Sequence, residues 1–159
     1  MRIELNPPVG VGSLLIGMSL EDAVEACAVW GQVSVSRGSG DLPTVLAAHP
    51  RFQVVAHCED GSSVTAVEVW QPAPSTRRDA PDIAVLFRGL DIFRTPAREL
   101  LAQLAALGYR VANGESDRPS LPELTLGFTR DSGHEVPMED DGLPLFFEAV
   151  LVARAGYYG

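Results

Sequence analysis

The sequence predicts an α+β fold in which two tandem units, each a helix followed by an antiparallel meander of three strands, form one extended sheet with the helices on one face. Three observations support this prediction: two amphipathic helix patterns, alternating β-rich segments joined by hairpin signals, and three blocks of the first half that recur in order in the second. A chain of 159 residues can bury a sizeable core, so we expect one compact domain.

The apparent duplication sets the expected organisation. The segment from Ser19 to Gly31 aligns with Pro96 to Gly108 at an offset of 77, Pro50 to Val54 aligns with Pro122 to Leu126 at an offset of 72, and Val64 to Val69 aligns with Phe147 to Val152 at an offset of 83. A self-match at one long period is typical of stacked units. We therefore expect a first unit over residues 1–70, a Pro-rich linker over 71–81 and a second unit over 82–159.

Each predicted helix has a start signal, an apolar stripe and a glycine at its end. In the first, Ser19 is the expected N-cap and the helix should stop at Gly31. In the second, Thr95 is the expected cap, Pro96 occupies the first helical position and Gly108 ends the helix. Both helices are amphipathic and need a sheet or another helix to cover their apolar faces.

The strands follow from alternation and turn signals. Phe52 to Cys58 and Val64 to Trp70 flank an Asp-Gly turn and predict one hairpin, and Leu124 to Arg130 with Phe146 to Ala153 predict the other. Short β-rich segments are expected to add strands at 33–36, 109–112, 84–87 and 14–16. The segment 42–48 fits either a helical turn or a strand.

Strand alternation assigns the side chains of these hairpins to two faces. The face toward the helices takes eight apolar residues: Val54, Ala56, Val67, Val69, Leu126, Phe128, Val150 and Val152. The other face then receives Val55, His57, Glu68, Trp70, Phe147, Ala149 and Leu151. Trp70, Phe147 and Leu151 would form an apolar patch with His57, Glu68 and Glu148 at its rim. Such a patch favours a binding surface, although a homodimer partner or the N-terminal segment would also cover it.

The ten residues from Leu15 to Val24, with Gly17-Met18-Ser19 before the helix, resemble the opening of the β-lactamase-inhibitor-protein-like and SmpA/OmlA-like families. The resemblance implies helical segments followed by antiparallel meanders, in tandem in the inhibitor proteins. It also implies a sheet surface that binds another protein, and no catalysis. Gly-Met-Ser is equally a favourable strand-to-helix turn, with Gly for the backbone and Ser for the cap.

Composition limits the partners. The net charge of -9, from 21 acidic and 12 basic residues, would repel phosphate backbones, so we expect no nucleic acid partner; it suits a basic protein, or simply solubility. No apolar run approaches the roughly 18 residues of a membrane span, and the N-terminus does not fit a signal peptide, so a cytoplasmic protein is expected. Cys27 and Cys58 fit buried free thiols better than a lone bridge.

Motifs that carry chemistry are scarce. The sequence has no Walker loop, Rossmann glycine pattern, Gly-x-Ser-x-Gly elbow or His-Glu-x-x-His. His49, His57 and His134 fall on a loop, a strand and a loop, which makes a metal site improbable, and no cofactor is predicted. His57 and Cys58 are adjacent in a strand and point to opposite faces, so they cannot act together as base and nucleophile.

The second hairpin is longer than the first by the 11 residues from His134 to Pro144. Insertions in one copy of a repeat fall on loops, and loops often carry function. This one holds the carboxylates Glu135, Glu139, Asp140 and Asp141, which suit a basic partner or, more weakly, a cation; a merely tolerated loop fits equally.

We therefore expect a non-enzymatic protein-interaction module, in a specific version an immunity- or antitoxin-like or inhibitor-like protein. Its expected binding residues are His57, Glu68, Trp70, Phe147, Leu151, Glu139, Asp140 and Asp141, on the open sheet face and the acidic loop. The alternative is a small enzyme or ligand binder with a pocket between the two halves, lined by His57, Glu68 and Trp70.

Overall fold

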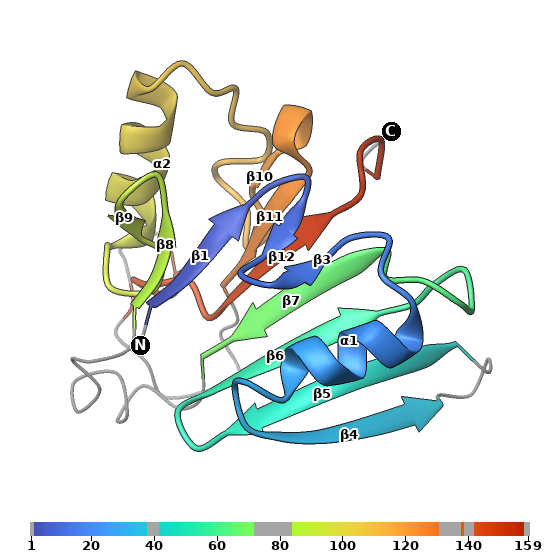
Figure 1. Cartoon of the computed structure of the whole chain (residues 1–159). Coiled ribbons are helices and arrows are strands. Elements are labelled where there is room, and N and C mark those ends of the chain that lie inside the picture. Colours follow the sequence, from blue (N-terminus) through green and yellow to red (C-terminus); the bar gives the residue numbers. More distant parts are fainter. Residues whose placement is uncertain (1, 38–41, 72–83, 131–137, 139–141, 158–159) are drawn as a thin grey trace.

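The computed structural model describes residues 2–37, 42–71, 84–130, 138 and 142–157. In these ranges the chain forms two helices and two sheets, an α+β fold as predicted (Figure 1). The predicted linker, residues 71–81, lies outside the described residues except for Gln71, and most of the acidic loop is also outside them.

The larger sheet has seven strands in the order β10-β11-β12-β7-β6-β5-β4, and all its neighbours are antiparallel. Both predicted hairpins belong to it. Its strands are β4 (Gln32–Arg37), β5 (Pro43–His49), β6 (Phe52–His57), β7 (Ala66–Trp70), β10 (Ser120–Leu121), β11 (Leu126–Thr129) and β12 (Ala149–Ala153). The ambiguous segment 42–48 is thus a strand. The strand expected at 109–112 is reduced to a single bridge between Ala112 and Ser120.

The smaller sheet has five short strands in the order β3-β2-β1-β8-β9. They are β1 (Arg2–Asn6), β2 (Gly10–Val11), β3 (Leu14–Leu15), β8 (Ala84–Phe87) and β9 (Leu90–Asp91). β1 and β8 pair in parallel, so the N-terminal strand lies beside a strand from the second half of the chain. The prediction of one extended sheet is therefore wrong: the short strands expected near 14–16 and 84–87 belong to this second sheet.

Helix α1 (Leu20–Cys27) begins as predicted, because the Ser19 hydroxyl accepts a hydrogen bond from the Asp22 amide at 3.2 Å. It ends at Cys27, before the predicted stop at Gly31. Helix α2 (Ala97–Ala106) starts one residue later than expected: Pro96 itself is the N-cap, without a side-chain capping bond, and Thr95 precedes it. Gly108 follows α2 with a φ of 100°, a left-handed conformation that glycine adopts without strain.

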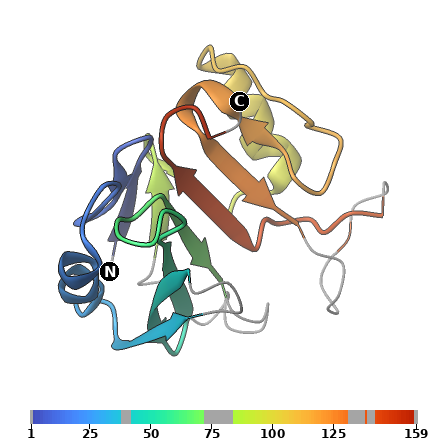
Figure 2. The ribbon, with the colours of Figure 1, turned by 90° about the vertical axis from the view of Figure 1, so that its right-hand side faces the viewer.

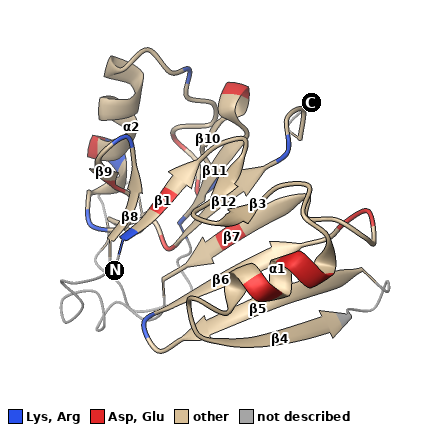
Figure 3. Cartoon of the chain, in the orientation of Figure 1, with Lys and Arg blue, Asp and Glu red and all other residues tan. Residues whose placement is uncertain are grey.

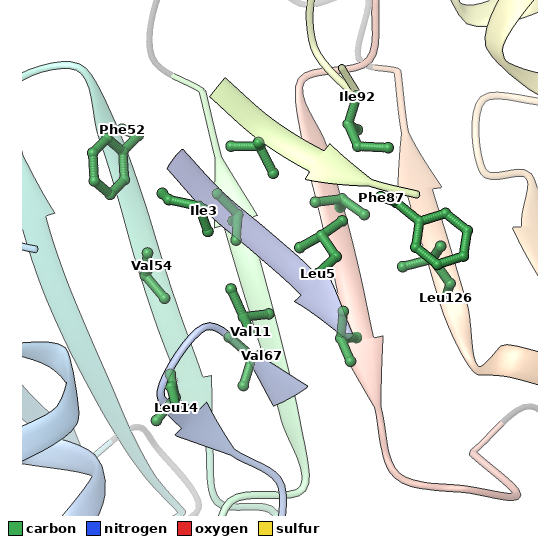
Figure 4. Packing of buried hydrophobic residues seen from close by; sticks show 14 of the residues in the cluster. Ile3, Leu5, Val11, Leu14, Phe52, Val54, Val67, Phe87, Ile92 and Leu126 are labelled. Carbon is green, nitrogen blue, oxygen red and sulfur yellow. The ribbon is translucent and has the colours of Figure 1, made fainter. Parts of the chain in front are cut away.

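The core lies between the two sheets and the helices. Figure 4 shows side chains of β1, β2, β3 and β8 directed at the strands of the larger sheet, with Val11 close to Val67. All eight residues predicted to face the helices belong to this buried cluster, together with the buried faces of α1 and α2. Figure 2 shows α1 and the strands β1 to β3 on the same side of β5, β6 and β7. We call this side of the larger sheet its inner face.

The two halves of the chain are not organised identically. After α1 the chain forms four consecutive antiparallel strands, β4 to β7, whereas after α2 it forms three, β10 to β12. The two-unit repeat is therefore not confirmed and stays a prediction. Cys27 and Cys58 are both buried free thiols, as expected. Neither described helix has the length and hydrophobicity needed to cross a membrane.

Candidate functional site

The candidate site is the outer face of the larger sheet, opposite the inner face. Strand register places Leu46, Val55, Glu68 and Leu151 in one row across β5, β6, β7 and β12. All four side chains are half-buried, as is Trp70 in the next row. None of these five residues belongs to the core cluster or packs against it. The outer face thus has an apolar surface that lies outside the core.

His57 and Glu68 form a close pair on this face. They lie diagonally on β6 and β7, because His57 is opposite Ala66 and Glu68 is two residues further along the same strand. The imidazole Nε2 lies 2.6 Å from Glu68 Oε1, and the two side chains are 28% and 23% exposed. A partly desolvated pair of this length is a charge-assisted hydrogen bond when the imidazole is protonated.

The pair favours the protonated imidazole. The hydrogen bond with Glu68 raises the pKa of His57 above its ordinary value of 6.5; burial opposes this shift, and the charges of Glu68 and Glu59 add to it. Below pH 6.5 the outer face therefore presents a carboxylate bound to a cationic ring.

A second polar contact lies beside the pair and comes from the end of the chain. The Tyr157 hydroxyl donates to Glu59 Oε1 at 3.3 Å, and the backbone of Arg154 bonds to that of Thr65 at 3.0 Å. Burial raises the pKa of Tyr157, and the charges of Glu59 and Glu68 act in the same direction. Tyr157 is 37% exposed. The segment after β12 thus extends the outer face toward Glu59, which the sequence did not reveal.

Phe147 does not belong to this site, which corrects the sequence prediction. Its ring is fully buried in the core cluster and stacks on Phe128 with the ring centroids 4.9 Å apart. The Arg130 guanidinium lies 5.7 Å from the centroid of the same ring. Regular alternation ends at Ala149, where β12 begins, so Phe147 is free to turn inward although its position has the parity of the outer face.

The remaining predicted positions have different outcomes. Ala149 has the outer-face parity but is 1% exposed, and it is not part of the core cluster. Glu148, directly before β12, is half-buried. Glu135, Glu139, Asp140 and Asp141 lie outside the described residues, so the expected acidic binding loop stays a prediction.

The described side chains offer little for metal or nucleophile chemistry. Within the described ranges no group of three or more His, Cys, Asp or Glu residues is placed to hold a metal ion. Burial raises the pKa of Cys58, which holds its thiol in the protonated and less reactive form. Three pockets lined by described residues lie on other parts of the molecule, and none of these three includes His57, Glu68 or Trp70.

Charge is unevenly distributed around the site. Figure 3 shows acidic residues on β7, on β1 and along α1. On and beside the outer face, the carboxylates of Glu59 and Glu68 interact electrostatically with His57. The carboxylate of Asp60 interacts in the same way with Arg154. The Ser63 hydroxyl, the Ser63 amide and the Ser62 amide all donate to Asp60 and lower its pKa to about 2, so this carboxylate stays ionised.

Comparison with protein-family models, with curated proteins and with solved structures finds no significant match to this chain. The resemblance of residues 15–24 to inhibitor-like families therefore stays a prediction.

Because His57 and Glu68 form this pair, we expect the free energy of unfolding to depend on pH. The pKa of His57 in the folded protein lies above 6.5. The contribution of the pair to the free energy of unfolding is therefore present in full below pH 6.5, and it is lost as the pH rises through the folded pKa. For a partly exposed pair we expect about 1 kcal/mol or less. Urea unfolding from about pH 5 to about pH 8 measures it. The Glu68→Gln variant should lose this slope, and an unchanged slope would contradict the assignment.

Proposed function

We propose that this protein is a non-enzymatic interaction module that binds a protein partner through the outer face of its larger sheet. The observation that carries the proposal is the row of half-buried side chains across β5, β6, β7 and β12, which lies outside the core cluster. Apolar side chains in the centre of a face, with charged groups beside them, match the anatomy of protein interfaces.

The apolar part of the outer face supplies anchors for a partner. Trp70 and Leu151 lie on neighbouring strands in adjacent rows, with Trp70 opposite Ala149 and Leu151 opposite Glu68. Tryptophan is enriched among the residues that dominate binding energy, because it buries a large area at a small cost in conformational entropy.

The charged part of the outer face favours a basic partner. Glu59 and Glu68 each accept one hydrogen bond from within the chain, and a carboxylate can accept several. An arginine or lysine of a partner would find free acceptor positions on both. The overall net charge of -9 would also attract a basic protein over long range. An immunity-like or inhibitor-like protein that covers a basic protein is the specific form of this proposal.

The test compares two double variants as baits. Trp70→Ala with Leu151→Ala removes the anchors of the outer face; Val29→Ala with Leu107→Ala removes two residues that are 64% and 58% exposed outside that face. A partner recovered with the wild type should bind the first variant about thirtyfold more weakly or worse and the control unchanged. Equal binding to both variants, with equal thermal stability, would refute the outer face as the site.

A further inference from the structure

A pocket on the smaller sheet has features of a ligand site and is unrelated to the outer face. It has a volume of about 460 Å³ and lies where β1 ends, beside the turn from β8 to β9 and the 3-10 helix η2 (Pro122–Leu124). The smaller sheet packs against the inner face, so this pocket and the outer face lie on different sides of the larger sheet. The volume falls within the range of small-molecule pockets.

The lining combines an apolar surface with a few polar groups. Leu124 provides the accessible apolar part, because Leu5 and Phe87 also border the pocket but are only 5% and 3% exposed; Glu4, Asn6 and Arg88 provide the polar part. In ligand pockets a few polar groups fix the orientation of the ligand.

The two charges in the pocket are opposite and do not neutralise each other. Within the described part of the chain, Glu4 and Arg88 form no ion pair with one another, and neither side chain has a hydrogen-bond partner; the Arg88 guanidinium lies only over the Phe87 ring, 5.8 Å from its centroid. A pocket that presents an unpaired cation and an unpaired anion is complementary to a molecule that carries both charges.

Arg88 has a backbone conformation that residues other than glycine, asparagine and aspartate rarely adopt. It is the first residue of the two-residue turn between β8 and β9, in which Phe87 pairs with Leu90, and both Arg88 and Gly89 have positive φ, 54° and 81°. Turns of this kind favour Asn-Gly or Asp-Gly, because a Cβ atom is crowded at positive φ and the short polar side chains of Asn and Asp offset this by hydrogen-bonding locally. An arginine at such a position adds conformational strain, and strain of this kind clusters at ligand-binding sites.

We propose that this pocket binds a small zwitterion with an apolar body, such as an amino acid or a dipeptide. The ligand carboxylate pairs with the Arg88 guanidinium, which suits planar bidentate recognition. Its ammonium group pairs with the Glu4 carboxylate, and an apolar side chain of the ligand lies against Leu124. The Asn6 amide, which can donate and accept, is available to a peptide group between the two charges.

The test uses leucyl-leucine as the probe and follows the backbone amides of the isotope-labelled protein by NMR. We expect saturable shifts at Asn6, Gly12, Arg88 and Leu124, with a dissociation constant in the millimolar range or below, roughly 1 mM. N-acetyl-leucyl-leucine and leucyl-leucinamide each lack one charge and should bind about tenfold more weakly or worse. No saturable shift at up to about 10 mM, or equal binding of the capped peptides, would overturn the proposal.

Two variants separate binding from folding. Arg88→Asn removes the guanidinium and also relieves the turn, so it should raise the melting temperature while weakening leucyl-leucine binding about tenfold or more. Glu4→Gln should weaken leucyl-leucine but leave the affinity for N-acetyl-leucyl-leucine unchanged. Arg118→Asn, which replaces an exposed arginine outside the pocket, is the matched control. Binding that survives Arg88→Asn would refute the pocket as the carboxylate site.

Discussion

Replacing Phe147 by alanine is expected to lower the free energy of unfolding by about 3–5 kcal/mol. The ring is fully buried, stacks on Phe128 and lies beneath the Arg130 guanidinium, so truncation removes all these contacts and leaves a cavity among large neighbours. Chemical denaturation measured by tryptophan fluorescence and by circular dichroism gives the loss. The two methods should report the same transition if unfolding is two-state.

Leu151→Ala is the matched control for Phe147. Both residues have the parity of the outer face, but Leu151 is half-buried and lies outside the core cluster, so its truncation should cost only about 1 kcal/mol. The predicted difference between the two variants is therefore larger than either experimental error. A loss of only about 1 kcal/mol for both variants would show that Phe147 faces outward, as the alternation of the sequence predicted.

The reversal at Phe147 shows where sequence alternation stops being informative. Alternation predicted the eight inner-face residues correctly, because each lies within a paired strand where successive side chains must point to opposite faces. Phe147 lies two residues before β12 begins. Outside the paired strands the backbone is free to turn, and burial of the large apolar ring in the core is then favourable.

The smaller sheet could not be predicted because its central pairing is remote and short. β1 pairs with β8, about eighty residues away, through three residues: Arg2 with Ala84, Ile3 with Val85, and Glu4 with Leu86. Arg2 to Asn6 does alternate polar and apolar residues, which is a strand signal, but nothing local indicates its partner. The pocket beside Arg88 depends on this pairing and was therefore also beyond sequence reasoning.

The outer face was predictable in part. Strand alternation placed His57, Glu68, Trp70 and Leu151 on one face, and the structure does so too. The contact between His57 and Glu68 depends on the register of β6 against β7. The Asp-Gly turn predicted that the two strands pair, but it did not determine their register. Tyr157 reaches Glu59 over 98 positions of sequence, and no pattern in the sequence announces such a contact.

Arg130, immediately after β11, is a cation that is only 1% exposed. Its guanidinium donates to the carbonyls of Ser116 at 3.2 Å and Pro144 at 3.5 Å, and its Nε has no hydrogen-bond partner. Within the described residues no carboxylate pairs with it. Desolvation of such a charge costs several kcal/mol, which two carbonyls and the Phe147 ring offset only in part.

Arg130→Ala and Arg130→Met should therefore differ sharply in stability. Alanine leaves a cavity beside Phe147 and removes both hydrogen bonds, so it should lower the free energy of unfolding by about 3 kcal/mol. Methionine fills the same space without a buried charge and should stay within about 1 kcal/mol of the wild type. Urea denaturation of the wild type and of the two variants measures these differences in the free energy of unfolding. A methionine variant as unstable as the alanine variant would show that the two carbonyl contacts, rather than packing, are what holds this residue in the core.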